Sequence, residues 1–316
     1  MKNLQKLLNA DKITIARTIT AVENGTDTKI LEEIFSHTGT AYYIGITGPP
    51  GSGKSTLVNA IVKKLLKDDR KIGIIAVDPT SPFSGGALLG DRIRMTDLAL
   101  HENVFIRSMA SRGSLGGLAK KTKDVALVLD AAGMDFILIE TVGVGQVELD
   151  IAQVCDTTIV TLVPESGDSI QAMKAGLLEV ADVVVINKSD REGSDILMIE
   201  LKFAFELREQ KVGWHYPILK TIATEHTGVK ELVSTIKSHK KYLEKDGRID
   251  IERKEKMALI LNELIEEKIK SHLKKYVINE DRLEELVNKA YLRKINPYNI
   301  ADKITKKALE EKKSYE

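Results

Sequence analysis

The sequence predicts an α/β fold with a mainly parallel, doubly wound sheet. Between about residues 40 and 240, short β-rich runs alternate with helical segments, a pattern typical of parallel sheets. Most of these runs also lack the apolar/polar alternation of a half-exposed strand. Continuous apolar runs are typical of central strands that are buried on both faces. The predicted strands are 42–47, 72–77, 104–106, 136–139, 158–163 and 183–187.

Helical segments flank this predicted sheet. In residues 2–36 apolar side chains recur at helical spacing, which predicts two helices, and Glu23-Asn24-Gly25 is a plausible stop for the second. From about residue 241 the chain becomes dense in charged residues and carries one apolar helical stripe. Such a stripe must pack on something, either the parent domain or a second copy. The stripe is formed by Met257, Ile260, Leu261, Leu264, Ile265 and Ile269.

Composition sets the broad class of protein. The 316 residues include 47 basic and 46 acidic side chains, a net charge of +1, which gives no case for a nucleic-acid or membrane partner. Cys155 is the only cysteine, so neither a disulfide framework nor a cysteine-rich metal site is expected. The amino terminus lacks a signal-like apolar core, and no stretch offers eighteen uncharged apolar residues. We therefore expect a cytoplasmic protein.

The segment from Gly48 to Ser55 fits the phosphate-loop pattern G-x-x-x-x-G-K-[ST] and lies between a predicted strand and a predicted helix. Its glycines let several backbone N–H groups surround a phosphate chain, and the following helix adds the positive end of its dipole. Lys54 can reach the β- and γ-phosphates, and the Ser55 hydroxyl is a ligand for Mg²⁺. The expected fold is therefore a P-loop NTPase. Its predicted phosphate-binding residues are Gly48, Gly51, Ser52, Gly53, Lys54, Ser55 and Thr56.

The tetrapeptide Asn187-Lys188-Ser189-Asp190 follows the predicted strand 183–187 and matches the guanine-reading motif N-K-x-D. An aspartate carboxylate accepts from guanine N1–H and the 2-amino group, whereas adenine presents a bare acceptor there. The mismatch costs on the order of 1–3 kcal/mol, enough to select GTP over ATP. Asn187, Lys188 and Asp190 are thus predicted to bind the base, and Thr224 to help close its pocket.

Three acidic residues are candidates for the Mg²⁺ site together with Ser55. Asp78 and Glu140 each end a predicted strand, so they project from the carboxyl edge where ligands bind in open α/β sheets. Asp91 follows the glycine-bearing stretch 84–90. A hard divalent ion prefers oxygen ligands, which all three supply directly or through water. The glycine-containing loops 84–90 and 143–145 are expected to act as nucleotide-dependent switches.

At several blocks the sequence resembles the MeaB/ArgK family of GTPases. The resemblance runs through the whole predicted GTPase domain and extends to Arg17 and Glu23 near the amino terminus. Two small departures are Thr80, where the family has serine, and Val147, where a small polar residue is frequent. The matching blocks are 45–56, 77–82, 90–95, 140–146, Ser166-Gly167-Asp168 with Gln171 and Lys174, and Asn296-Pro297-Tyr298.

The resemblance implies a G protein that acts as chaperone to an adenosylcobalamin-dependent acyl-CoA mutase, typically methylmalonyl-CoA mutase. GTP binding and hydrolysis would gate cofactor delivery and protect the mutase. It also implies a homodimer formed through a C-terminal helical arm, and a partner-responsive switch in the segment of Lys174. The implied organisation is an N-terminal helical segment (1–40), a P-loop GTPase domain (41–240) and a dimerisation arm (241–316).

Carried over by position, Lys54 and Ser55 bind phosphates and Mg²⁺, and the three acidic residues named above surround the metal. Lys54, Glu140 and Gln146 are the catalytic candidates. Gln146 is a candidate to orient the attacking water by analogy with other GTPases, and a purely structural glutamine is an equal alternative. No built-in arginine finger is evident; Arg92, Arg94 and Arg112 all stay open.

Three alternative functions make different predictions for this sequence. Some relatives carry the name of an ATP- or GTP-dependent kinase linked to amino-acid transport. A kinase function predicts a preference for ATP, whereas Asp190 in the motif N-K-x-D predicts a preference for GTP. A metal-insertion GTPase of the nickel type would be expected to carry a His- or Cys-rich metal store, which six scattered His and one Cys do not form. A scaffold with a structural GTP site would show no turnover.

Overall fold

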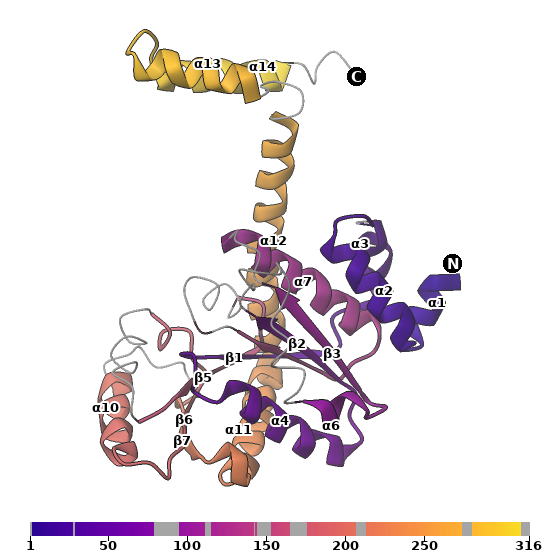
Figure 1. Ribbon diagram of the computed structural model, residues 1–316, viewed down its shortest axis with the longest axis vertical. Coiled ribbons are helices and arrows are strands. Elements are labelled where there is room, and N and C mark those ends of the chain that lie inside the picture. The colour runs from indigo at the N-terminus through magenta and orange to yellow at the C-terminus, as the bar shows by residue number, and fades with distance from the viewer. Residues whose placement is uncertain are drawn as a thin grey trace. The chain divides into compact units, whose positions relative to one another are not determined.

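A computed structural model of the chain describes residues 2–27, 29–78, 95–110, 115–141, 143, 153–164, 176–206, 213–273 and 280–310. These residues divide into two compact units, Met1–Ile249 and Asp250–Glu316. The first unit contains a seven-stranded sheet in the order β3-β2-β4-β1-β5-β6-β7 (Figure 1). Its strands are β1 (Tyr42–Thr47), β2 (Ile72–Asp78), β3 (Val104–Ala110), β4 (Phe136–Glu140), β5 (Thr157–Leu162), β6 (Val183–Asn187) and β7 (Ile218–Thr221).

Every pairing between these strands is parallel, which confirms the predicted α/β class. All seven carboxyl ends therefore lie at one edge of the sheet. β1 occupies the centre, with Ile46 beside Glu140 of β4 on one side and beside Ile159 of β5 on the other. The loop that leaves β1 consequently emerges between the ends of two neighbouring strands, where open α/β sheets bind their ligands.

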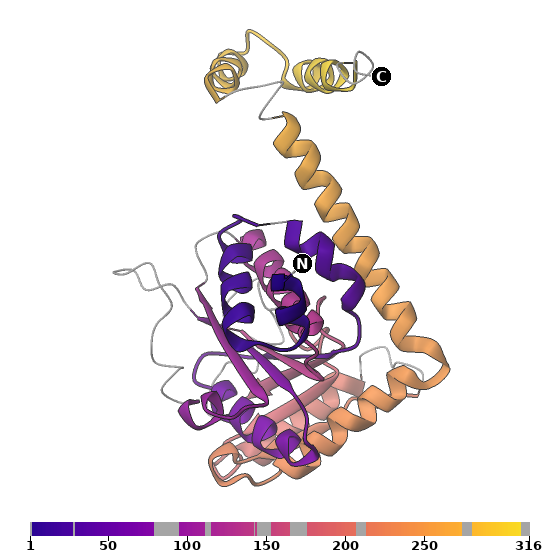
Figure 2. The same cartoon turned by 90° about the vertical axis from the view of Figure 1, so that its right-hand side faces the viewer.

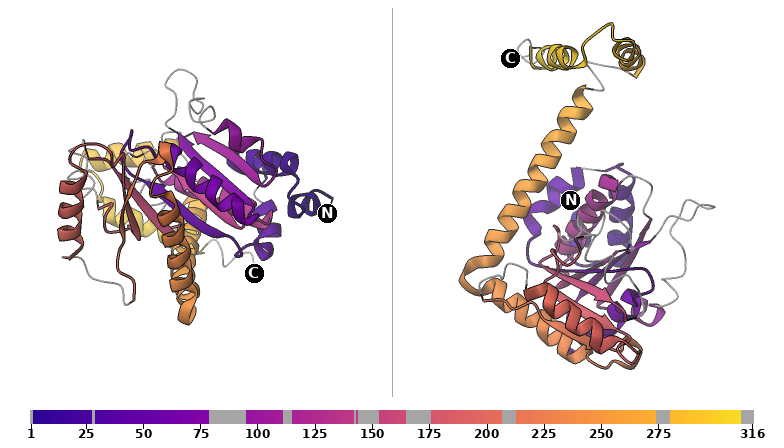
Figure 3. Two further views of the ribbon diagram at one scale, coloured as in Figure 1. Left: turned by 90° about the horizontal axis from the view of Figure 1, so that it is seen from below. Right: turned by 90° about the vertical axis from the view of Figure 1, so that its left-hand side faces the viewer.

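Helices cover both faces of the sheet (Figures 1 and 3). On one face, α4 (Lys54–Leu65) and α11 (Val229–Glu244) pack on side chains such as Ile44 and Leu138. On the other, α7 (Leu115–Ala131) covers Ile137 and Ile139 of β4, and α10 (Ser194–Glu206) covers Val160 and Val184. Because alternate residues of a strand point to opposite faces and helices cover both, nearly every residue of the central strands β1, β4, β5 and β6 is buried, and apolar runs without alternation result.

The amino-terminal region forms three short helices, α1 (Lys2–Leu8), α2 (Lys12–Glu23) and α3 (Lys29–Ile34), where the sequence predicted two. The additional helix is α3, which follows the predicted stop at Glu23. The first two helices are separated at Asp11, which caps α2 by accepting from the Thr14 N–H. The side-chain and backbone hydrogen bonds from Thr14 lower the pKa of the Asp11 carboxyl. The predicted stop of the second helix is confirmed, because α2 ends at Glu23. Of these helices, α2 and α3 pack on α7, and α1 packs on α2 (Figure 2).

Two strands differ from the prediction by more than one residue at an end. β3 was predicted to end at residue 106 but continues to Ala110, because the Arg107 guanidinium is paired with Glu23 of α2 and tolerates a half-buried position. β7 was missed altogether. It has only four residues, three of them half-buried, so its apolar signal is weak.

Asp130 of α7 fixes the chain just before β1. Its carboxylate accepts from the backbone N–H groups of Gly39 (2.7 Å) and Ala41 (3.0 Å), and from the Tyr43 hydroxyl (2.8 Å). Asp130 is buried, so these donors replace the water that the charge loses. These hydrogen bonds fix the start of β1 to α7. The phosphate loop follows at the other end of β1.

The remaining helices are short connections or belong to the second unit. No helix in the described parts of the chain is long and apolar enough to cross a membrane. In the second unit, α12 has no buried residue, and the predicted apolar stripe lies on it. These elements are η1 (Phe35–His37), η2 (Leu66–Asp68), α6 (Thr96–Ala99), η3 (Ala223–Glu225), η4 (Lys245–Gly247), α12 (Arg248–His272), α13 (Glu280–Tyr291) and α14 (Pro297–Glu310).

Candidate nucleotide-binding site

The phosphate loop joins β1 to α4 in the predicted strand–loop–helix arrangement. Gly53 caps α4 in the left-handed region (φ 86°), and a Cβ at this position would lie 2.4 Å from Asn187 Nδ2. Glycine is therefore required both by the backbone angle and by the close approach of Asn187. The first N–H groups of α4 have no partner within the helix, which leaves an anion-binding terminus where the pattern predicts one.

Lys54 is buried, and its ammonium group lies across the loop. Nζ donates to the carbonyl oxygens of Gly48 (2.8 Å) and Pro49 (3.0 Å). Gly143, in the loop after β4, lies close to Lys54 Nζ and to the Gly48 carbonyl oxygen. A Cβ on Gly143 would lie 2.9 Å from the first atom and 2.3 Å from the second. The loop after β4 thus touches the phosphate loop beside its lysine, and only glycine permits that contact.

Ser55 and Glu140 meet at the first turn of α4. The Ser55 hydroxyl donates to Glu140 Oε1 at 2.6 Å, and both side chains are buried. Glu140 is the last residue of β4, and its neighbour in the sheet is the strand that leads into the phosphate loop. The structure therefore brings a hydroxyl and a carboxylate oxygen together beside the phosphate loop, a pair of hard oxygen donors of the kind that Mg²⁺ prefers.

Several predicted residues cannot be placed in this way. Asp78 ends β2 as predicted, but its side chain is outside the described part of the chain. Asp91 and Gln146 lie wholly outside the described residues, as do most of the predicted switch loops, Lys174 and the three candidate arginines. Among the described residues no group of three or more His, Cys, Asp or Glu side chains is placed to hold a metal.

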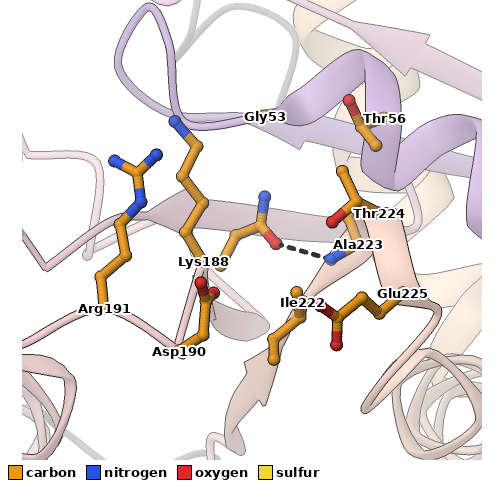
Figure 4. Close-up of a pocket in the computed structure, with 10 residues that line it drawn as sticks. Gly53, Thr56, Lys188, Asp190, Arg191, Ile222, Ala223, Thr224 and Glu225 are labelled. Atoms are coloured by element: carbon orange, nitrogen blue, oxygen red, sulfur yellow. Dashed lines mark hydrogen bonds between the residues drawn. The ribbon is translucent and has the colours of Figure 1, made fainter.

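Asn187 connects the guanine motif to the phosphate loop. Its side-chain Nδ2 donates to the Ser52 carbonyl (2.8 Å), while its Oδ1 accepts from the Thr221 hydroxyl and the Ala223 N–H, both at 3.1 Å. One buried amide thus joins the ends of β6 and β7 to the loop after β1. The bond to Ala223 is the dashed line in Figure 4.

Lys188 makes a second connection between the same two motifs. Its backbone adopts the left-handed region (φ 54°), which turns the side chain toward the phosphate loop, and Nζ donates to the Gly51 carbonyl at 2.8 Å. The motif N-K-x-D predicts that Asn187 and Lys188 bind the base but does not predict their contacts with the phosphate loop. These contacts join residues 135 and 137 positions apart in the sequence, so they cannot be inferred from the spacing of a local motif.

A pocket of about 170 Å³ lies between the phosphate loop and the guanine motif (Figure 4). Gly53, Thr56, Asp190 and Thr224, which were predicted to bind the nucleotide, all line this pocket. The pocket also includes residues that sequence analysis did not assign. Its full lining is Gly53, Thr56, Asn187, Lys188, Asp190, Arg191, Ile222, Ala223, Thr224 and Glu225.

Comparison with known proteins identifies the family of the chain. The family model described as "Methylmalonyl Co-A mutase-associated GTPase MeaB" matches residues 15–277. A provisionally named GTPase of Pyrococcus abyssi is 45% identical over 97% of this chain and 96% of its own. The GTPase ArgK of Escherichia coli is 35% identical over 89% of this chain and 87% of its own.

Two further relatives extend the comparison. The mouse protein named "Methylmalonic aciduria type A homolog, mitochondrial" is 32% identical over 84% of this chain and 65% of its own. The crystal structure titled "LAO/AO transport system kinase" aligns with a TM-score of 0.74 and 27% identity, covering 96% of both chains. Since the family match spans more than half of the sequence, the chain belongs to the MeaB family of methylmalonyl-CoA mutase-associated GTPases.

Proposed function

We propose that this GTPase is the chaperone of an adenosylcobalamin-dependent acyl-CoA mutase of the methylmalonyl-CoA mutase type. In this role GTP binding and hydrolysis gate delivery of the cofactor and protect the mutase. The observation that carries the proposal is the match to a mutase-associated family over residues 15–277. The two side-chain connections from the guanine motif to the phosphate loop support its GTPase part, because they join the residues predicted to bind the base to the loop predicted to bind the phosphates.

The bound nucleotide is proposed to span the pocket, with the base at Asp190 and the phosphates on the loop at Gly51–Ser55. Hydrolysis forms a bond between a water oxygen and the γ-phosphorus and breaks the bond from that phosphorus to the β–γ bridging oxygen. The products are GDP and phosphate, and the water proton passes to phosphate or solvent. Lys54 Nζ, which already lies at the loop, would stabilise the charge that builds up on the phosphate oxygens.

The donor set beside Lys54 fits Mg²⁺, since the Ser55 hydroxyl and the Glu140 carboxylate lie 2.6 Å apart. These two residues would hold the ion, with Asp78 and Asp91 as further proposed ligands directly or through water. When bound, Mg²⁺ supplies positive charge to the phosphate oxygens. Gln146 is still proposed as the residue that orients the attacking water.

The proposed client can be tested directly. GTP and ATP hydrolysis by the purified protein should be measured alone and with the adenosylcobalamin-dependent mutase from the same organism. We expect turnover of GTP, little turnover of ATP, and a GTP rate that rises when the mutase is added. A GTP rate indifferent to the mutase would contradict the chaperone function and leave a GTPase with another client. Preference for ATP would favour the kinase alternative.

The second unit is proposed to form a homodimer. In α12 the apolar side chains of Met257, Leu261, Leu264 and Ile265 follow one helical stripe and are all exposed. An apolar stripe on a long helix is stable in water when it packs on another surface. Burying it against a second copy would satisfy this need.

The dimer prediction has a matched control within the same helix. Residues 259 and 261 lie roughly 200° apart around the helix axis, so Leu259, which is also exposed, is on the opposite side from the stripe. We expect Leu261→Glu to weaken the dimer at least about tenfold, because it places a charge in an apolar contact, and Leu259→Glu to leave it intact. Sedimentation equilibrium measures both. A dimer that survives Leu261→Glu would disprove the arm, provided that GDP affinity shows intact folding of the first unit.

A further inference from the structure

The base end of the pocket carries a second carboxylate. Asp190 comes from the loop after β6, and Glu225 comes from the turn after β7; both line the same pocket. Figure 4 shows them on the side of the pocket that faces away from Gly53 and Thr56, and so away from the phosphate end. The guanine motif accounts for Asp190 but gives no role to Glu225.

The turn that carries Glu225 is held firmly although its side chain is exposed. The Ala223 N–H is fixed by Asn187 Oδ1, and the Glu225 N–H donates to the Ile222 carbonyl at 3.0 Å. On the far side, the Ile222 N–H donates to Thr227 at 3.1 Å, which closes the turn. Because the backbone of Glu225 is fixed before any ligand binds, only its side-chain rotamers must be ordered on binding, and the entropic cost is small.

Guanine offers more donors at this edge than one carboxylate can accept. N1–H and one hydrogen of the 2-amino group face a single carboxylate in the usual two-bond arrangement, and the second amino hydrogen remains. Adenine has neither donor at these positions. An acceptor on the same side of the pocket would therefore add selectivity for guanine, because only this base presents the remaining N–H group.

We propose that Glu225 is a further specificity-determining residue, which accepts the second hydrogen of the guanine 2-amino group while Asp190 accepts the first together with N1–H. The inference rests on the proposed guanine site at this pocket. It identifies the 2-amino group, rather than the ribose or the phosphates, as the part of the nucleotide that Glu225 contacts.

Inosine diphosphate provides the test, since hypoxanthine is guanine without the 2-amino group. Binding of GDP and IDP should be measured by calorimetry for the full chain and for Glu225→Ala. We expect Glu225→Ala to lower the affinity for GDP about fivefold to tenfold and to leave the affinity for IDP unchanged. Glu225→Gln keeps an acceptor oxygen, so its affinity for GDP should fall less than that of Glu225→Ala.

Glu231→Ala is the matched control, because it removes an equally exposed carboxylate from the first turn of α11, outside the pocket lining. It should bind both nucleotides like the parent. Equal losses of GDP and IDP in Glu225→Ala, or no loss of either, would overturn the role of Glu225 while leaving the guanine site intact. If the unmodified chain does not prefer GDP over ADP, the guanine site itself is wrong, so the two failures are distinguishable.

Discussion

Replacing Glu140 by alanine is expected to lower Mg²⁺-dependent GTP hydrolysis by about a hundredfold while GDP binding persists. The Glu140 carboxylate is buried and accepts from the Ser55 hydroxyl at 2.6 Å, so its loss removes one proposed Mg²⁺ ligand and the hydrogen-bond partner of a second, Ser55. Removing a preorganised charge that acts on the transition state typically costs about a hundredfold or more in turnover. The base end is anchored separately through Asp190, so GDP affinity should change much less.

A second variant and a Mg²⁺ titration show whether the loss of turnover comes from the metal site. Glu140→Gln keeps the size of the side chain and one acceptor oxygen but removes the charge, and a similar loss of turnover would assign the effect to charge rather than to a cavity. Turnover should be measured against Mg²⁺ concentration, because a weakened metal site raises the concentration needed for half-maximal rate. Full activity of Glu140→Ala at limiting Mg²⁺ would remove Glu140 from the metal site.

The layered fold was predictable because its signals are local. The phosphate loop, the apolar strands and the acidic residues at strand ends are all read from neighbouring residues, and β1, β6 and the end of β4 at Glu140 agree with the prediction. Failures occurred where stability comes from distant partners. In β3, the charge of Arg107 is paired with Glu23 of α2, a residue far away in the sequence. The strand β7 is recognisable only from its pairing with β6.

Four residues that the structure brings to the candidate site were predictable from the sequence, but the connections between them were not. Residue types and spacing predicted Lys54, Ser55, Glu140 and Asp190 from their chemistry. Neither type nor spacing indicates that Asn187 holds the phosphate loop by its side chain, or that the turn after β7 adds Glu225 to the pocket, since both contacts arise only when β1, β6 and β7 share one edge. The connection of the guanine motif to the phosphate loop therefore depends on tertiary structure.

The largest change in nucleotide preference is expected from Asp190→Asn. The carboxylate of Asp190 is proposed to accept from N1–H and the 2-amino group, and an asparagine presents an N–H donor toward that amino group. Two hydrogen bonds to a charge are weakened and a donor–donor contact is created, so GTP affinity should fall at least about a hundredfold. Xanthine carries a carbonyl oxygen in place of the amino group and can accept from the new amide, so nucleotide preference should shift from GTP toward XTP.

Asp195→Asn is the matched control for this exchange. It makes the same substitution five residues later, at an exposed side chain of α10 that is paired with Lys220 and does not line the pocket. Hydrolysis of GTP, ITP and XTP should be compared for both variants. Unchanged selectivity in Asp190→Asn would refute guanine reading by this motif and with it the proposed role of Glu225. A shift toward XTP confined to Asp190→Asn would instead allow this GTPase to be controlled separately. In a mixture of GTPases, XTP would then activate only the Asp190→Asn variant, while the other GTPases use GTP. Any rise in mutase activity on adding XTP would be attributable to this variant.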